Sequence, residues 1–141
     1  MSEDAGGYLY SEAEQYEAFK ATAPGVPILM VNLIRFHALA RYPAGHPDAG
    51  AGRSGAQAFA IYRREVAPII ARVGGRQSLS AVDGLTLIGP PRERWDWFAV
   101  NEYPGVEAFL ALMRDPGYRA ASVHRAAAIA DTRTIRCLPA R

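Results

Sequence analysis

The chain has 141 residues, of which 50% are hydrophobic and 21% are charged, and its formal net charge is +2. This size and balance predict one globular domain with a substantial core, and they exclude a disordered or fibrous protein. The charge is too small to indicate a nucleic-acid surface, and no apolar run approaches the roughly 20 residues of a membrane span.

The single cysteine, Cys137, excludes an intramolecular disulfide and the usual cysteine-rich zinc site. The opening MSEDAGGYLYSEAE is acidic and lacks the basic region and apolar run of a signal peptide. We therefore expect a soluble, unexported protein of the reducing cytoplasm that binds neither nucleic acid nor a membrane.

The chain opens with a predicted helix over residues 11–23, where Ser11 and Glu14 have the spacing of a capping box. Residues 25–36, GVPILMVNLIRF, predict a strand because they are rich in aliphatic residues. Alternate side chains of a strand point to opposite faces, and here both faces are mostly apolar.

Residues 37–54 form a polar loop that is rich in glycine and proline and longer than most connections. The period then changes to that of an amphipathic helix over about 55–73. Its apolar stripe consists of Phe59, Tyr62, Val66, Ile69 and Val73. We expect a kink or a new turn at Pro68, and an end at Gly74.

The second half alternates in the same way between strands and helices. Residues 76–89 predict a strand with a bulge at Asp83-Gly84, and residues 95–103 predict its hairpin partner. A helix follows through VEAFLALM and restarts at Asp115-Pro116, where aspartate caps the helix and proline takes its first position. The segment TRTIRCLP predicts a terminal strand.

The element order is strand, helix, strand, strand, helix, strand, which predicts an α+β, ferredoxin-like βαββαβ fold with helices on one face of an antiparallel sheet. We assign residues 25–141 to this single domain and residues 1–24 to an N-terminal helical extension. The other sheet face would expose apolar side chains, so we expect a second copy of the sheet to cover it in a homodimer.

Several blocks of the sequence resemble a known family in the right order. These blocks are PILMVNLIRF, ARVGGR, LIGPPRERWD, the YP of NEYPGVEAFLALMRDPGY, and HRAAAIADTR. They look like the DUF1330 family, one branch of the dimeric α/β-barrel superfamily, over roughly residues 25–138. The resemblance implies a ferredoxin-like subunit whose sheet packs against its twin. It implies no particular reaction, because the wider superfamily includes cofactor-free oxygenases, isomerases, haem-binding oxygenases and dimeric regulators.

The helical segment DPGYRAASVHRAAAIAD carries two candidate site residues, His124 and Arg125. Arg125 shares a stripe with Tyr118, whereas His124 lies a quarter turn away among alanines. Arg125 has two interpretations, a structural ion pair and a clamp for a substrate anion. The candidate ion-pair partners are Asp96, Asp115 and Asp131. His124 has three interpretations: a packed histidine bonded to a backbone carbonyl, a general acid or base, and a haem ligand.

Four further residues are candidates for a ligand pocket. Asn32 places an amide on an apolar strand face, where it either bonds to the backbone of a neighbouring loop or helix or orients a substrate carbonyl. Trp95 either builds the core or dimer interface or forms the flat wall of an aromatic-ligand pocket. Tyr62 and Tyr118 carry the same two interpretations.

Two motifs are set aside at this point. The GAGRSG of residues 50–55 matches a dinucleotide fingerprint, but no strand ends directly before it. His37, His46 and Asp48 lie in an irregular loop without the helical spacing of a persuasive metal site. We therefore expect no metal and no cofactor, and we expect Cys137 to be inert.

The leading hypothesis is a homodimer with a small apolar pocket between sheet and helices, acting as a cofactor-independent oxygenase or isomerase on a small aromatic or enolisable acid. In it Arg125 holds the anion, His124 moves a proton and Asn32 orients a carbonyl, while aromatic side chains line the walls. The alternative is a non-catalytic ligand-binding or structural dimer, and a lesser alternative is a haem-binding protein.

Overall fold

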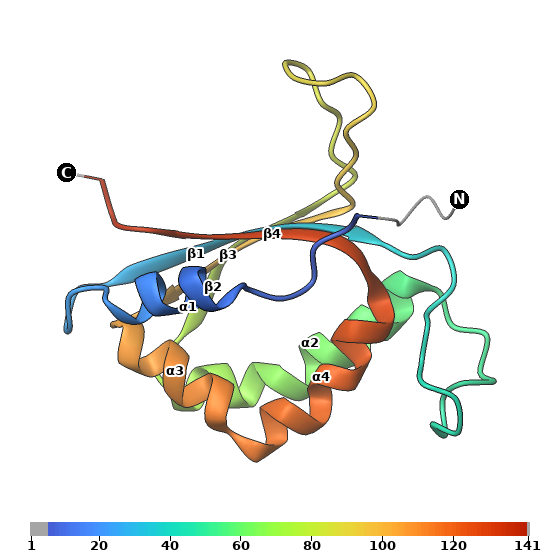
Figure 1. Cartoon of the computed structure of the whole chain (residues 1–141), viewed down its shortest axis with the longest axis horizontal. Helices are drawn as coiled ribbons and strands as arrows, with labels where there is room; N and C mark the ends of the chain where they lie inside the picture. The colour runs from blue at the N-terminus through green and yellow to red at the C-terminus, as the bar shows by residue number, and fades with distance from the viewer. Residues whose placement is uncertain (1–5, 141) are drawn as a thin grey trace.

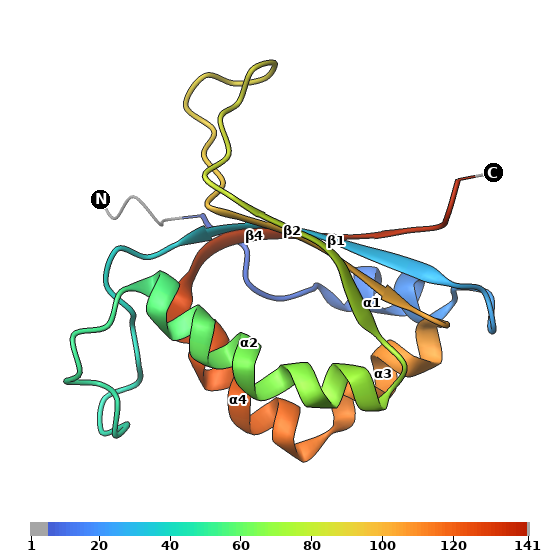
Figure 2. The ribbon, with the colours of Figure 1, turned by 180° about the vertical axis from the view of Figure 1, so that it is seen from behind.

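The computed structural model describes residues 6–140, in which four antiparallel strands form one sheet and helices cover one of its faces (Figures 1 and 2). The strands are β1 (Ile28–Phe36), β2 (Arg76–Val82), β3 (Trp97–Tyr103) and β4 (Ile129–Cys137). Their order across the sheet is β2-β3-β1-β4, so the first and third strands lie at the centre. Together with the helix that follows β1 and those that follow β3, this order is the ferredoxin-like arrangement, and the predicted fold class is confirmed.

The helices are α1 (Ala13–Lys20), α2 (Gly55–Arg72), α3 (Val106–Arg114) and α4 (Pro116–Ala128). Asp115 caps α4 as predicted, because its carboxylate accepts from the amides of Gly117 and Tyr118. At α1 the cap is Glu12 rather than Ser11, since the side chain of Gln15 accepts from the Glu12 amide. Within residues 6–140, no helix combines the length and the apolar character that crossing a bilayer requires.

The core lies between the helices and the sheet face that carries the even-numbered side chains of β1. Ile28 and Leu112 are almost fully buried there. A second apolar cluster, around Ile34 and Phe59, fills the other end of the same layer. The helix α1 joins the layer through an edge-to-face contact between Phe19 and Phe109, whose ring centroids are 5.1 Å apart.

The opposite sheet face carries no helix in Figures 1 and 2, and its side chains are mostly apolar. Strand register places nine apolar residues on it, which we call the bare face: Leu29, Val31, Leu33, Leu79, Ala81, Phe98, Val100, Ile135 and Cys137. Each of these side chains is partly or largely exposed in the single chain.

A long hairpin, residues 83–96, rises from the bare face on the side away from the helices, and we call it the arm (Figure 1). We predicted a strand through residue 89, but β2 ends at Val82 because Asp83 takes a left-handed conformation with φ of 56°. The predicted bulge at Asp83-Gly84 is therefore wrong, and the irregularity of β2 lies between Gln77 and Leu79.

Candidate functional site

A cavity of about 670 Å³ lies between the helix-covered face of the sheet and helices α2, α3 and α4. Its volume falls in the range of sites that hold small molecules, about 300–1,000 Å³. Aromatic side chains from both layers form much of its wall: Phe59, Tyr62, Trp97, Tyr103, Phe109 and Tyr118. The small residue Ala99, on the strand between them, leaves the space open.

The charged residues that line the cavity are all arginines: Arg63, Arg64, Arg76 and Arg125. No aspartate, glutamate, histidine or cysteine is among the lining residues that the structure describes. Arg63 stacks on Trp97 with its guanidinium 4.0 Å from the ring centroid, and Arg76 pairs with Glu102 at 2.6 Å. The cavity therefore offers an apolar, aromatic interior with a positive potential.

Arg125 is the innermost of these cations, a half-buried residue of α4. Its guanidinium donates one hydrogen bond, from Nη1 to the carbonyl of Leu9 at 3.1 Å. Its three predicted ion-pair partners are engaged elsewhere: Asp96 accepts from the Phe36 amide, Asp115 pairs with Arg72 and Asp131 pairs with Arg133. The structural ion pair is therefore wrong for residues 6–140, and most of the guanidinium N–H groups of Arg125 remain for a ligand.

Two tyrosine hydroxyls lie near Arg125. The Tyr62 hydroxyl donates to the Tyr118 oxygen at 3.0 Å. Burial, with a further contribution from Tyr118, raises the pKa of Tyr62 well above its ordinary value, although the nearby Arg125 opposes the shift. Tyr62 thus stays protonated and donates, which leaves the Tyr118 hydroxyl hydrogen free to donate into the cavity.

Asn32 lines the same cavity from β1. Its amide nitrogen donates to the Met30 carbonyl at 3.2 Å, and its oxygen accepts from the Thr134 hydroxyl at 3.0 Å. The predicted bond to a loop or helix backbone is therefore wrong, because both partners lie on strands of the sheet. One amide hydrogen still has no protein acceptor among the described residues, so Asn32 can donate to a ligand as well.

Trp95 does not line the cavity, contrary to the pocket-wall interpretation. It lies buried at the base of the arm, where its indole N–H donates to Glu93 and its ring centroid is 5.3 Å from the Arg133 guanidinium. The predicted strand began at residue 95, but β3 begins only at Trp97, so the alternation of the strand does not reach Trp95. Trp97 supplies the indole of the cavity instead.

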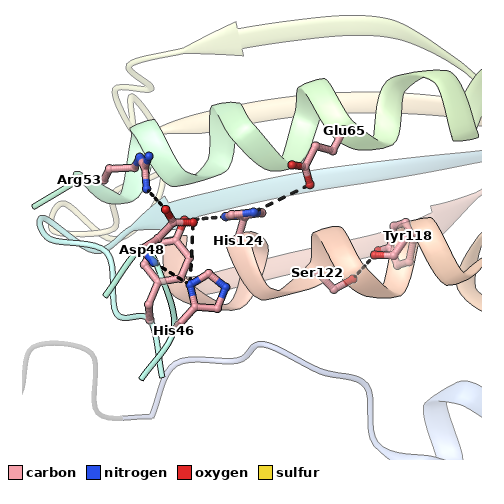
Figure 3. A network of polar contacts seen from close by, with 8 residues as sticks. His46, Asp48, Arg53, Glu65, Tyr118, Ser122 and His124 are labelled. Carbon is pink, nitrogen blue, oxygen red and sulfur yellow. Dashed lines mark hydrogen bonds and ion pairs between the residues drawn. The ribbon is translucent and has the colours of Figure 1, made fainter. Parts of the chain in front are cut away.

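His124 also lies outside the cavity, in a polar cluster between α4, α2 and the 37–54 loop (Figure 3). Its Nδ1 is 2.7 Å from the Tyr42 hydroxyl, and its Nε2 is 3.8 Å from a carboxylate oxygen of Glu65. The alanines around His124 left space on this side of α4, and the loop fills that space. Neither ring nitrogen is directed at the cavity, so this geometry supports neither proton transfer there nor haem ligation by His124.

The loop end of the cluster is held by contacts among its own residues. The Asp48 carboxylate pairs with Arg53 at 2.7 Å, and its amide donates to Nδ1 of His46 at 3.0 Å. His46 stacks on the ring of Tyr42 with centroids 4.9 Å apart. The bond to Arg53 holds the pKa of Asp48 below its usual value, and burial raises the pKa of Tyr42. The Tyr42 hydroxyl therefore stays protonated in its hydrogen bond with His124.

Sequence reasoning set His46 and Asp48 aside and did not consider Tyr42. Within residues 6–140, no three or more histidine, cysteine, aspartate or glutamate side chains are grouped so as to hold a metal ion. The structure thus brings Arg125, Tyr62, Tyr118 and Asn32 to one cavity. His124 belongs to a separate cluster that fixes the loop.

The sequence matches no protein-family model and no curated protein. The structure is similar to two crystal structures of the RPA0582 protein. The methylated RPA0582 protein has 39% sequence identity and a TM-score of 0.87, with 96% of each chain covered. The second, described as a protein of unknown function from Rhodopseudomonas palustris, has 38% identity and a TM-score of 0.86, with coverage of 96% and 98%.

A third solved structure is much less similar. It is a dimeric protein of unknown function with a ferredoxin-like fold from Bacteroides fragilis. Its identity is 12% and its TM-score is 0.49, with 80% of this chain and 96% of that chain covered. A likeness at this level carries no argument about function or assembly.

Proposed function

Because the chain belongs to the family of RPA0582, whose function is unknown, we propose its function from the cavity: it binds a small anionic molecule with an aromatic or apolar body. The observation that carries the proposal is the cavity wall, in which the half-buried Arg125 has no carboxylate partner and lies among six aromatic side chains. An uncompensated guanidinium in a partly buried site is costly unless an anion answers it.

Two sets of groups in the cavity would bind different parts of the ligand. Arg125 and the Tyr118 hydroxyl would donate to a carboxylate, since a guanidinium offers planar, charge-assisted hydrogen bonds. Trp97, Phe59 and Tyr103 would pack on the apolar body. Asn32 would donate its remaining amide hydrogen to a second oxygen of the ligand.

The test is isothermal titration with a charged probe, 2-naphthoate, and its uncharged counterpart 2-naphthylmethanol. A charge-assisted hydrogen bond contributes about 1.5–3 kcal/mol, so we expect the anion to bind at least about tenfold more tightly. Arg125→Gln should remove that preference while leaving the affinity for the alcohol unchanged.

Arg114→Gln is the matched control, because Arg114 is exposed at the end of α3 and does not line the cavity. It should leave both affinities at the wild-type level. Equal affinity of the wild-type protein for the two probes, or an unchanged preference in Arg125→Gln, would contradict the proposal.

A catalytic use of the same site is the second candidate, in keeping with a cofactor-independent enzyme of the isomerase or oxygenase type. It is favoured by the position of Arg125 beside the Tyr62–Tyr118 hydroxyl pair, which could stabilise the negative oxygen of an enolate. His124 has no part in this version. Exchange of the α-protons of phenylpyruvate in D₂O, followed by NMR, tests it. Exchange at the buffer rate would eliminate this candidate.

We also propose that two chains pair through their bare faces as a homodimer, which would fit the resemblance to the DUF1330 family. The support is the run of apolar side chains along the bare face, at whose centre Val31 and Val100 lie opposite each other. Sedimentation equilibrium at micromolar concentration should give twice the chain mass. A mass near 15.3 kDa would refute the pairing.

A further inference from the structure

The arm, residues 83–96, has features of a rigid structure with an apolar end rather than those of a loose loop. At its base the amides of Asp83 and Gly84 donate to the carbonyls of Asp96 and Trp95, each at 3.1 Å. Further out, the Thr86 hydroxyl donates to the Glu93 carbonyl at 2.8 Å. These bonds tie the outgoing half of the arm to the returning half.

The outgoing half of the arm is apolar and largely uncovered. Leu85, Leu87 and Ile88 have exposed fractions of 86%, 85% and 93%. The returning half carries charged residues, including Arg92 and Arg94. Three large aliphatic side chains this exposed on one short segment indicate a surface that is covered in the working protein.

We propose that the arm of one chain clasps a second copy of this chain, with Leu87 and Ile88 packed against the outer side of the partner. The arm rises on the same side as the bare face (Figures 1 and 2). A molecule seated on the bare face therefore lies beside the arm. The inference rests on the proposed sheet-to-sheet homodimer and adds a second contact to it.

The dimensions agree with a clasp. Packed sheets lie about 10 Å apart, whereas residues 83–89 can span up to about 20 Å at about 3.3 Å per residue. The arm is therefore long enough for its tip to pass beyond the plane of the partner's sheet and to meet the partner beside or behind it. In a two-fold dimer each chain gives one arm and receives one, so the contact closes without further copies.

The arms would also add contact area to a pair that meets through the bare face. Four strands about 4.8 Å apart, two about 23 Å long and two about 30 Å long, give a projected face of about 510 Å². A stable interface buries about 800 Å² on each partner. The two arms would add apolar surface to this interface.

A membrane is the other partner that could cover the arm, because its exposed apolar side chains lie near arginines. A flat bilayer could take the tip of the arm but could not at the same time reach the bare face, from which the arm rises. A second chain covers both surfaces at once, and for that reason we favour it.

The test compares the dimer dissociation constants of wild type, Ile88→Asp and Leu39→Asp by sedimentation. Leu39 is the matched control, because it is also an exposed aliphatic residue, 60% accessible, in the 37–54 loop. Ile88→Asp should keep the wild-type circular dichroism, since Ile88 packs on nothing in the single chain. We expect it to raise the dissociation constant about tenfold or more, because each chain would lose one buried aliphatic side chain from the interface. Leu39→Asp should leave the constant unchanged.

The possible outcomes separate the arm from the sheet pairing. A wild-type monomer would refute both. A wild-type dimer with the same constant in Ile88→Asp and Leu39→Asp would refute the arm alone. A mass above that of two chains would also refute the closed clasp. The proposal would also be refuted if Ile88→Asp left the dimer unchanged but abolished cosedimentation with vesicles that contain phosphatidylserine. The arm would then be a membrane contact.

Discussion

Replacing His124 separates the two roles that the sequence left open for it. The Tyr42 hydroxyl and Nδ1 of His124 share a hydrogen bond of 2.7 Å, and the two rings meet edge to face with centroids 5.5 Å apart. His124→Leu keeps most of the volume but removes the hydrogen-bond partner of Tyr42. We expect a loss of stability without any loss of ligand binding, because His124 does not line the cavity.

The size of the loss follows from those two contacts. A part-buried hydroxyl without an acceptor costs about 1–3 kcal/mol, and an edge-to-face aromatic contact contributes about 0.5–1.5 kcal/mol. Together they give about 2–4 kcal/mol. For a chain of this size 1 kcal/mol shifts the melting temperature by about 2–4 °C, so Tm should fall by roughly 5–15 °C.

Urea unfolding followed by circular dichroism gives the free energy, and hydrogen exchange shows where it is lost. The informative amide is that of Arg41, which donates to the Ala127 carbonyl at 2.8 Å and ties the loop to α4. Its protection should fall in His124→Leu. His124→Asn keeps a polar atom near the position of Nδ1 and should recover part of both losses. If His124→Leu kept its stability but lost 2-naphthoate binding, the separation of the cluster from the cavity would be wrong.

Three further predictions concern the fold. Leu112→Ala should cost about 2–5 kcal/mol in urea unfolding, since Leu112 is only 2% exposed. Gly55→Ala should cost about 1–3 kcal/mol or more by the same assay, because the new Cβ would press on two backbone carbonyl oxygens. Burial opposes ionisation of Asp131, but the Tyr8 amide and the Arg133 guanidinium hold its pKa below the usual value. This stabilisation is present above the unfolded-state pKa near 4 and is lost as the pH falls through the folded-state pKa. Asp131→Asn should therefore lower the urea midpoint at pH 7, and the difference from wild type should shrink in acid.

The sequence predicted the elements that depend on local patterns. The stripe of α2, the Asp115 cap and the alternation of β1 each follow from a few neighbouring residues, and all are present. The cavity residues Asn32, Tyr62, Tyr118 and Arg125 were found for a related reason. A polar or bulky side chain on an apolar stripe is visible in sequence.

The parts that failed depend on tertiary contacts or on one backbone angle. Tyr42 and His124 are 82 residues apart in sequence. Tyr42 lies in the irregular 37–54 loop, which has no period from which its contacts could be predicted. The LTLIG of the arm has the composition of a strand, and only the left-handed turn at Asp83 directs it out of the sheet. On the returning half of the arm, Trp95 lies outside the alternation of β3, which begins at Trp97.

The strand order also governs when the protein can fold during its synthesis. The central strand β1 bonds to β4 along one edge, and about 90 residues separate them in the chain. At about 5–20 residues per second, a ribosome needs roughly 5–18 s to make that stretch. Until then one edge of β1 has no partner strand, and the core side of Ile34 has no α4 to cover it. The final residues of the chain, rather than the first, therefore complete the core.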